Sequence, residues 1–138
     1  MPQFSTTSKD RLRTCHQDLQ TLFHYVIEIF DCTIVCGARG REEQNKAFLD
    51  GKSQVRWANS KHNKIPSMAV DAAPFNNGAI DWDYEQMYYF AGFVLGVAKM
   101  LKKYGAITHD IRLGADWDGD NDIHDQRFKD LPHFEILT

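Results

Sequence analysis

Apolar residues recur every three or four positions between Ser8 and Phe30, which is the spacing of one face of an α-helix. The pattern predicts a single amphipathic helix over residues 8–30 that buries its apolar face in a core. The apolar positions of this helix are Leu12, Cys15, Leu19, Leu22, Phe23, Val26, Ile27 and Phe30.

Shorter patterns along the rest of the chain predict a small sheet and two more helices. Residues 33–36 are mostly β-branched and precede Gly37, which is typical of a buried strand that leads into a turn. Asn77 and Gly78 form a hairpin-type turn signal. Further strands are predicted over residues 68–73, 111–113 and 134–137, and helices over residues 41–50 and from Asp81 or Asp83 to about Tyr104.

Residues 52–66 show no periodicity and many polar side chains, so they are predicted to form a long surface loop. Loops of this length in compact domains tend to be functional, and this one contains His62. No repeat or linker divides the chain. We therefore predict one α+β domain over residues 1–138, with helices packed on one face of a small, mainly antiparallel sheet.

Composition limits the range of functions. The 138 residues are 43% hydrophobic and 25% charged, with a formal net charge of -3 that argues against nucleic-acid binding. No apolar stretch is long enough to cross a bilayer, and the N-terminal residues lack the apolar centre of a signal peptide. We expect no membrane insertion, folding in a cytoplasm, and a monomer. The three cysteines are predicted to be core thiols.

Asp71 is the first residue that points to chemistry. It lies within the apolar run of residues 69–73, where a carboxylate is costly unless a cation side chain or a metal ion meets it. His62 and His133 complete a set of ligands for a catalytic zinc, which uses three protein ligands and leaves a fourth position for water. From the residues alone the alternative stays open, because an isolated histidine is more often a solvated or core residue than a ligand.

A resemblance adds to this pattern. The segments Ser60-Lys61-His62, Ala69-Val70-Asp71 and Asp130-Leu131-Pro132-His133-Phe134-Glu135, together with Gly37-Ala38-Arg39 and Glu43-Gln44, occur in this order along the chain. They resemble motifs of the zinc peptidases that include the D-alanyl-D-alanine carboxypeptidases and dipeptidases. The chain is most similar to phage endolysins that act as L-alanyl-D-glutamate endopeptidases. One departure is the spacing of nine positions from His62 to Asp71. In members of this family the corresponding spacing is often shorter and includes a glycine.

The resemblance implies a fold like that of the hedgehog domains and D-Ala-D-Ala peptidases, with zinc bound by His62, Asp71 and His133. It implies that Asp130 is the general base and that Arg39 faces the scissile carbonyl. These roles suit the chemistry, since a carboxylate can accept a proton from attacking water and a guanidinium can stabilise an oxyanion.

The supporting residues have structural alternatives. Ser60 and Gln44 are expected to contact the substrate, although Ser60 suits a turn and Gln44 suits a helix that covers the sheet. Arg39 can instead pair with Asp31 or Glu42 at the surface. Glu135 follows His133 by two positions on a strand, so it either orients that ligand or faces solvent.

Alternate acidic residues follow at Asp116, Asp118, Asp120 and Asp122. The first three match positions one, three and five of a calcium-binding EF-hand loop. Asn121 stands at position six in place of glycine, and Arg127 at position twelve in place of glutamate. Related endolysins use such a loop as a calcium switch, so we consider a calcium site here. The alternative is a solvated acidic loop.

The leading functional hypothesis is a zinc endopeptidase that cuts the peptide stem of bacterial peptidoglycan between L-alanine and D-glutamate. As a phage endolysin it would be stored in the host cytoplasm and would act on the cell wall at lysis, without a separate wall-binding domain. The alternatives are a D-alanyl-D-alanine carboxypeptidase or dipeptidase, and a non-catalytic zinc-containing binding module.

Overall fold

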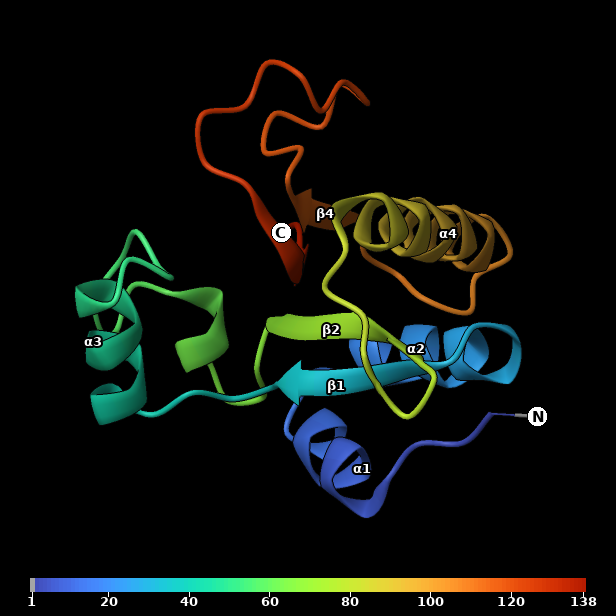
Figure 1. The fold of residues 1–138 in the computed structure, drawn as a ribbon, viewed down its shortest axis with the longest axis horizontal. Coiled ribbons are helices and arrows are strands. Elements are labelled where there is room, and N and C mark those ends of the chain that lie inside the picture. The colour runs from blue at the N-terminus through green and yellow to red at the C-terminus, as the bar shows by residue number, and fades with distance from the viewer. Residues whose placement is uncertain (1) are drawn as a thin grey trace.

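The sheet defines the architecture of this computed structural model, which describes residues 2–138 (Figure 1). Its strand order is β1-β2-β5-β4, every pairing is antiparallel, and the short β3 pairs with the end of β2. The mixed α/β class and the antiparallel sheet predicted from sequence are confirmed. The strands are β1 (Cys32–Cys36), β2 (Ala69–Asn76), β3 (Ala79–Ile80), β4 (Ile111–Gly114) and β5 (Asp130–Ile136).

One helix prediction is wrong. Residues 8–30 do not form one helix but two, α1 (Thr6–Arg13) and α2 (Gln17–Ile29), separated around Cys15. Ser67 causes the break, because its backbone exchanges hydrogen bonds with Thr14 and His16. The His16 ring then caps α2 by accepting the Asp18 N–H. The apolar spacing runs in phase across the break, so periodicity alone does not reveal it.

The other helices agree with expectation. The short α3 (Arg41–Leu49) is followed by Gly51, and α4 (Tyr84–Lys103) by Gly105. Of the two aspartates considered for the start of α4, Asp83 is the cap, since its carboxylate accepts the Gln86 N–H. A single 3₁₀ turn, η1 (Lys61–Asn63), lies within the predicted loop. The β5 strand begins four residues before its predicted start.

The main core lies between the sheet and helices α2 and α4 (Figure 1). Phe134 of β5 sits at its centre, with its ring 5.6 Å from that of Phe23 on α2 and 6.2 Å from that of Phe90 on α4. Each fully buried phenylalanine contributes on the order of 2 kcal/mol through the hydrophobic effect. Cys15 and Cys32 are buried free thiols, as expected, and Cys36 is half-buried.

Helix α1 covers the outer edge of β1, where an open strand would otherwise expose unpaired backbone groups. The Ile34 N–H donates to Ser8 Oγ, and the Arg11 guanidinium donates to the Ile34 carbonyl. Helix α3 stands apart, beyond the ends of β1 and β2 (Figure 1). Within residues 2–138, no helix combines the length and apolar character required to cross a membrane.

Candidate active site

The side chain of His62 is placed by the 3₁₀ turn η1. Ser60 caps this turn by accepting the His62 N–H, and the Asn63 side chain accepts the Ser60 N–H in return. His62 is only 2% exposed. The nine-residue spacing to Asp71 is accommodated because Lys64 and Ile65 project to solvent, while the His62 ring turns inward.

Asp71 and His133 are placed by strand pairing. They are direct partners in the β2–β5 register, so both side chains lie on the same face of the sheet. Phe134 points to the opposite face and into the core, because side chains alternate along a strand. The sheet therefore buries its apolar side under α2 and α4 and presents the polar residues on the other side.

His62, Asp71 and His133 converge on one point. The His62 Nε2 atom lies 3.1 Å from Asp71 Oδ1 and 3.2 Å from His133 Nδ1, and the Asp71–His133 distance is 3.2 Å. Ligands bonded tetrahedrally at zinc–ligand distances of 2.0–2.1 Å are about 3.3 Å apart, so the observed triangle matches one face of such a site. The structure thus brings together the three residues that the sequence analysis named as metal ligands.

The outward-facing ring nitrogens fix the tautomers of the two histidines. His62 Nδ1 lies 2.8 Å from the Gly37 carbonyl, and His133 Nε2 lies 2.8 Å from Glu135 Oε1. Each acceptor holds a proton on the nitrogen that faces it, which leaves the lone pairs of the other two nitrogens directed at Asp71. Three acceptors that face one another require a cation, and two imidazoles with a carboxylate suit zinc.

The electrostatics of the cluster indicate the same need for positive charge. Burial alone would lower the pKa of His62, but the Asp71 carboxylate raises it to about 10. Burial likewise opposes protonation of His133, and hydrogen bonds to Asp71 and Glu135 raise its pKa to about 9. Burial also opposes ionisation of Asp71, yet the two histidines hold its pKa far below the usual range.

Asp130 and Arg39 lie next to this cluster. Asp130 Oδ2 is 3.9 Å from His133 Nδ1, the atom that faces the proposed metal position. Burial and the negative charge of Asp71 raise the pKa of Asp130 to about 6. Arg39 Nη2 is 3.4 Å from Asp71 Oδ2, and the guanidinium does not pair with Asp31 or Glu42, the surface alternatives considered from sequence.

Gln44 and Ser60 serve the site from within the protein. Gln44 is 0% exposed: its oxygen accepts from Arg39 and Asn63, and its amide nitrogen donates to Ser53 and Val55. It has no exposed surface with which to touch a substrate, and it holds the Arg39 guanidinium in place. Ser60 acts as the turn cap and also lines the cleft.

Glu135 is 5% exposed, so the interpretation that it faces solvent is wrong. It holds His133 through Oε1 and accepts from Arg112 through Oε2 at 2.6 Å. The Arg112 guanidinium also donates to the Trp117 carbonyl, and the Trp117 ring lies 5.6 Å from the His133 ring. Sequence reasoning missed Arg112 and Trp117, because only the β4–β5 register reveals which side chains face Glu135.

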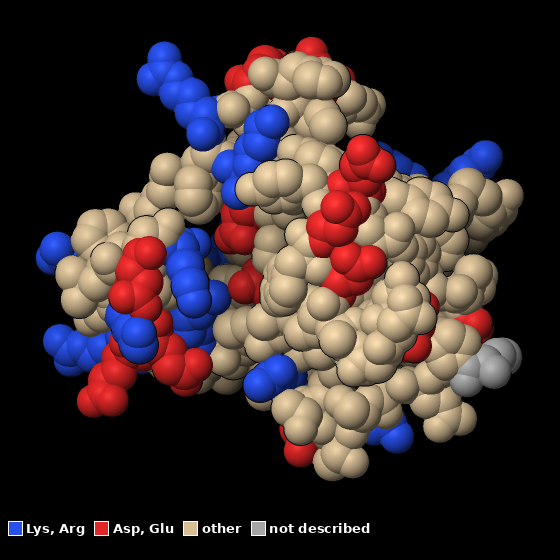
Figure 2. All heavy atoms as spheres, in the orientation of Figure 1, with Lys and Arg blue, Asp and Glu red and all other residues tan. Residues whose placement is uncertain are grey.

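A cleft of about 600 Å³ opens over the cluster, between the loop after α3 and the β4–β5 loop. Lys and Arg side chains border the hollow in this face, and acidic atoms are visible inside it (Figure 2). His62, His133 and Asp130 line the cleft, so a ligand in it would contact these side chains.

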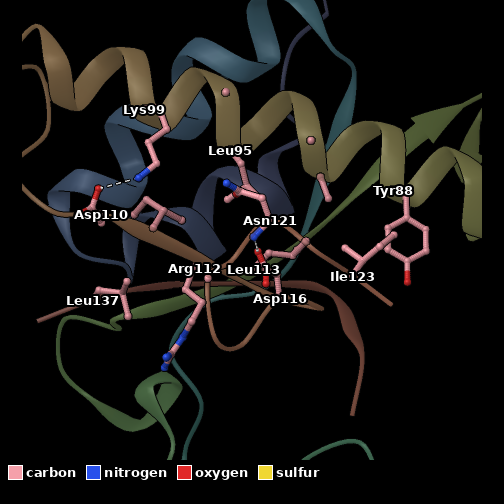
Figure 3. A pocket seen from close by; sticks show the side chains of 15 residues that line it. Tyr88, Leu95, Lys99, Asp110, Arg112, Leu113, Asp116, Asn121, Ile123 and Leu137 are labelled. Carbon is pink, nitrogen blue, oxygen red and sulfur yellow. Dashed lines mark hydrogen bonds and ion pairs between the residues drawn. The ribbon is translucent and has the colours of Figure 1, made fainter. Parts of the chain in front are cut away.

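The acidic loop brings together three of its four aspartates. Asp116, Asp118 and Asp120 cluster, whereas Asp122 instead binds His124. Asp116 borders a cavity of about 670 Å³ between α4 and β4, where one carboxylate oxygen accepts the Asn121 N–H (Figure 3). The other oxygen, Oδ1, is buried and has no hydrogen-bond partner among the described residues. A bound cation would supply that partner.

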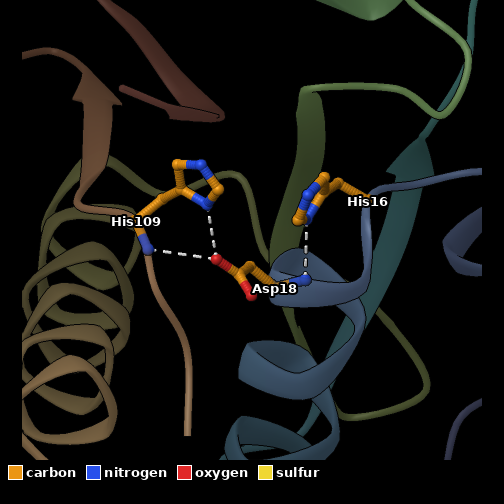
Figure 4. Close-up of side chains that lie close together, drawn as sticks. All are labelled: His16, Asp18 and His109. Atoms are coloured by element: carbon orange, nitrogen blue, oxygen red, sulfur yellow. Dashed lines mark hydrogen bonds and ion pairs between the residues drawn. The ribbon is translucent and has the colours of Figure 1, made fainter. Parts of the chain in front are cut away.

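A second cluster, His16, Asp18 and His109, was not predicted from sequence (Figure 4). Asp18 Oδ2 accepts from the His109 ring at 2.7 Å and from the backbone of Thr108 and His109. His16 Nδ1 already accepts the Asp18 N–H. These contacts join the start of α2 to the segment before β4, which is a structural function. None of the three residues lines the cleft above His62.

The fold is shared with a peptidase of known structure. The L-Ala D-Glu endopeptidase ChiX of Serratia marcescens superimposes with a TM-score of 0.72 over 98% of this chain and 90% of that chain, at 22% sequence identity. At this identity the likeness shows the fold alone.

Sequence comparison is more specific. The model of the phage L-alanyl-D-glutamate peptidase family matches residues 1–137. The L-alanyl-D-glutamate peptidase of Escherichia phage T5 is 30% identical over 127 residues, which cover 90% of this chain and 88% of that protein. The chain belongs to the phage L-alanyl-D-glutamate peptidase family.

Proposed function

We propose that this protein is a zinc-dependent endopeptidase that hydrolyses the bond between L-alanine and D-glutamate in the peptide stem of bacterial peptidoglycan. Its role would be that of a phage endolysin, which degrades the host cell wall at lysis. The observation that carries the proposal is the triangle of His62 Nε2, Asp71 Oδ1 and His133 Nδ1, of which the two histidines line the cleft.

These three residues would hold the zinc ion. When bound, zinc supplies positive charge that lowers the pKa of an attacking water and polarises the scissile carbonyl. Gly37 and Glu135 keep the two imidazoles in the tautomers that ligation requires. The β2–β5 pairing holds Asp71 opposite His133 before any ligand arrives.

Asp130 would be the general base. Its carboxylate lies beside the ligand atoms and lines the cleft, and its pKa of about 6 leaves it largely ionised at neutral pH. It would accept a proton from the attacking water and return it to the leaving amine of D-glutamate. A base with a pKa near the working pH performs both transfers efficiently.

Arg39 would stabilise the negative charge that develops on the scissile carbonyl oxygen. Gln44 fixes one of its terminal nitrogens, so the guanidinium is preorganised before the substrate binds. The planar guanidinium offers several N–H donors in a fixed arrangement, which suits an oxyanion.

Product analysis tests the reaction. Zinc-loaded protein is incubated with purified peptidoglycan, and the released fragments are identified by mass spectrometry. The proposal expects new N-terminal D-glutamate. Loss of terminal D-alanine would instead identify a carboxypeptidase, and a protein that binds zinc without releasing fragments would be a binding module. Elemental analysis that finds no zinc in a natively folded, zinc-replete preparation would refute the metal assignment.

Asp130→Asn tests the proposed base. This variant should retain its zinc and lose at least about a hundredfold in turnover, since general-base catalysis contributes on the order of 10² to 10⁴. Asp10→Asn, at an exposed position on α1, is the matched control and should cleave normally. Normal cleavage by Asp130→Asn would exclude the mechanism even if zinc is present.

We also propose that calcium binds Asp116, Asp118 and Asp120. The buried, unpartnered Oδ1 of Asp116 supports this, as does Asn121, whose φ of 67° provides the left-handed turn that glycine usually makes at this loop position. The hydrogen bond from the Asp122 N–H lowers the pKa of Asp120, but the negative charges of Asp118 and Asp125 outweigh it and raise that pKa. The raised pKa reflects a repulsion between carboxylates that a cation would relieve.

Calorimetric titration with calcium, followed by peptidase assays with and without it, tests this second site. Tryptophan fluorescence, to which Trp117 within the loop contributes alongside Trp57 and Trp82, gives a separate signal of ordering. Asp116→Asn should weaken calcium binding. The absence of binding heat, together with an unchanged cleavage rate in a calcium-selective chelator, would show that the loop is simply solvated.

A further inference from the structure

The charges that line the active-site cleft are unbalanced. Its walls contain five cationic side chains and only two carboxylates, Asp130 and Glu135, although the whole chain carries a net charge of -3. Blue side chains flank the hollow on two sides in Figure 2. The cations are Arg39, Lys52, Lys61, Arg112 and Arg127.

Three of these cations are held by partners inside the protein. Arg39 binds Gln44 and Asp71, and Arg112 binds Glu135. Lys61 lies 3.4 Å from Glu135 and also donates to the Ile136 carbonyl. Protein groups therefore already fix the positions of these three cations.

Lys52 and Arg127 are different. Both are exposed, and neither forms an ion pair or a side-chain hydrogen bond with any residue of the part of the chain that the structure describes. Lys52 comes from the loop after α3 and Arg127 from the β4–β5 loop, so they approach the cleft from two separate segments of the chain. Because both line the cleft, a ligand that fills it meets two positive charges that no group within residues 2–138 neutralises, and its chemistry should be anionic.

We infer that Lys52 and Arg127 form a carboxylate subsite that binds the free α-carboxylate of the D-glutamate residue in the substrate. This inference rests on the proposed function and specifies which chemical group of the substrate the cleft recognises. D-Glutamate is linked onward through its side-chain carboxyl, so its α-carboxylate stays free and charged, next to the bond that is cut. A planar guanidinium matches a carboxylate with two parallel hydrogen bonds, and lysine adds a flexible point charge.

The subsite predicts discrimination between two natural forms of the stem. Where D-glutamate is amidated to D-isoglutamine, the charge is lost while the scissile bond is unchanged. Two cations that face a neutral amide gain little from it, so the amidated substrate should react more slowly. Both cations are exposed, where a contact between opposite charges contributes about threefold, so losing two such contacts corresponds to about a tenfold preference for the free acid.

The test compares two soluble stem peptides, identical except for a free or an amidated α-carboxyl, with zinc-loaded protein. The expected wild-type ratio of kcat/KM is about ten in favour of the acid. Arg127→Gln and Lys52→Gln should each move the ratio toward one, chiefly by slowing the acid. Lys129→Gln removes an exposed cation from the same loop that does not line the cleft, so it should keep the wild-type ratio.

Binding provides a measurement independent of turnover. In the Asp130→Asn background, calorimetry should give tighter binding of the acid peptide than of the amide, and Arg127→Gln should reduce the difference. Equal wild-type rates and affinities for acid and amide would overturn the subsite while leaving the proposed function intact. Equal losses on both peptides in Arg127→Gln would also overturn it, as they would indicate a general contribution to the cleft. Failure to cleave either peptide would overturn the proposed function and the subsite together.

Discussion

Replacing Glu135 with glutamine should weaken zinc binding, although the residue would not touch the metal. The two carboxylate oxygens of Glu135 serve different donors, His133 on one side and Arg112 with Lys61 on the other. A glutamine has one acceptor and one donor in their place. Whichever way its amide turns, an N–H group faces either the His133 ring proton or the Arg112 guanidinium.

The structure sets the size of the effect. Burial raises the pKa of Glu135, but hydrogen bonds from His133 and Arg112 outweigh it and lower the pKa from 4.5 to about 2. That difference corresponds to roughly 3 kcal/mol of stabilisation of the folded metal-free protein. Because the folded-state pKa is depressed, this stabilisation is complete above about pH 4.5 and is lost as the pH falls toward 2. Glu135→Gln should therefore lower the free energy of unfolding at neutral pH by up to that amount.

Competition with a chromogenic chelator measures the zinc affinity. Loss of a partner that orients a metal-bound histidine typically costs about 10- to 100-fold in affinity, which is the expected range here. Glu28→Gln removes a charge from the exposed face of α2 and is the control for net charge. If Glu135→Gln bound zinc as tightly as the wild type and unfolded at the same temperature, the inferred role of Glu135 would be refuted.

Three further predictions follow from the site. Activity should fall on acidification with a midpoint at or below about pH 6, because protonation disables Asp130 and a bound cation nearby lowers the pKa of Asp130 further. A pH–rate profile with its midpoint above 7 would contradict this. Arg39→Lys should reduce kcat at least about tenfold with a smaller change in KM, measured by steady-state kinetics, since lysine lacks the planar fork. Gly114→Ala should destabilise the fold by about 1–3 kcal/mol in thermal unfolding, because its Cβ would lie 2.4 Å from the Asp130 carbonyl, whereas Gly96→Ala on α4 meets no atom within 4 Å and should not destabilise.

Local patterns predicted most of the secondary structure and failed where a distant segment intervened. The break between α1 and α2 depends on hydrogen bonds from Ser67, more than fifty positions away, and no glycine or proline marks it. The early start of β5 has a similar origin, since Asp130 pairs with Gly114 across an irregular register. A proline within this strand also obscured its length in the sequence.

The residues of the candidate site also fall into two groups, those that short motifs reveal and those whose contacts only the fold reveals. His62, Asp71 and His133 could be named because each lies in a short motif, and the structure places them together. Gln44 was recognised, but its contacts could not be predicted, since only the packing of α3 shows that it is buried behind Arg39. Arg112 lies in an ordinary strand pattern, and its partner Glu135 is fixed by register alone.

The position of residues 115–129 has a consequence for how such proteins can diversify. This segment leaves β4 and returns to β5, two strands that are already paired with each other, so its length does not affect the alignment of Asp71 with His133. The entropy of closing a loop grows only slowly with its length. Transplanting the segment from a relative could therefore change which wall chemistry is accepted, while the hydrolytic machinery is inherited unaltered.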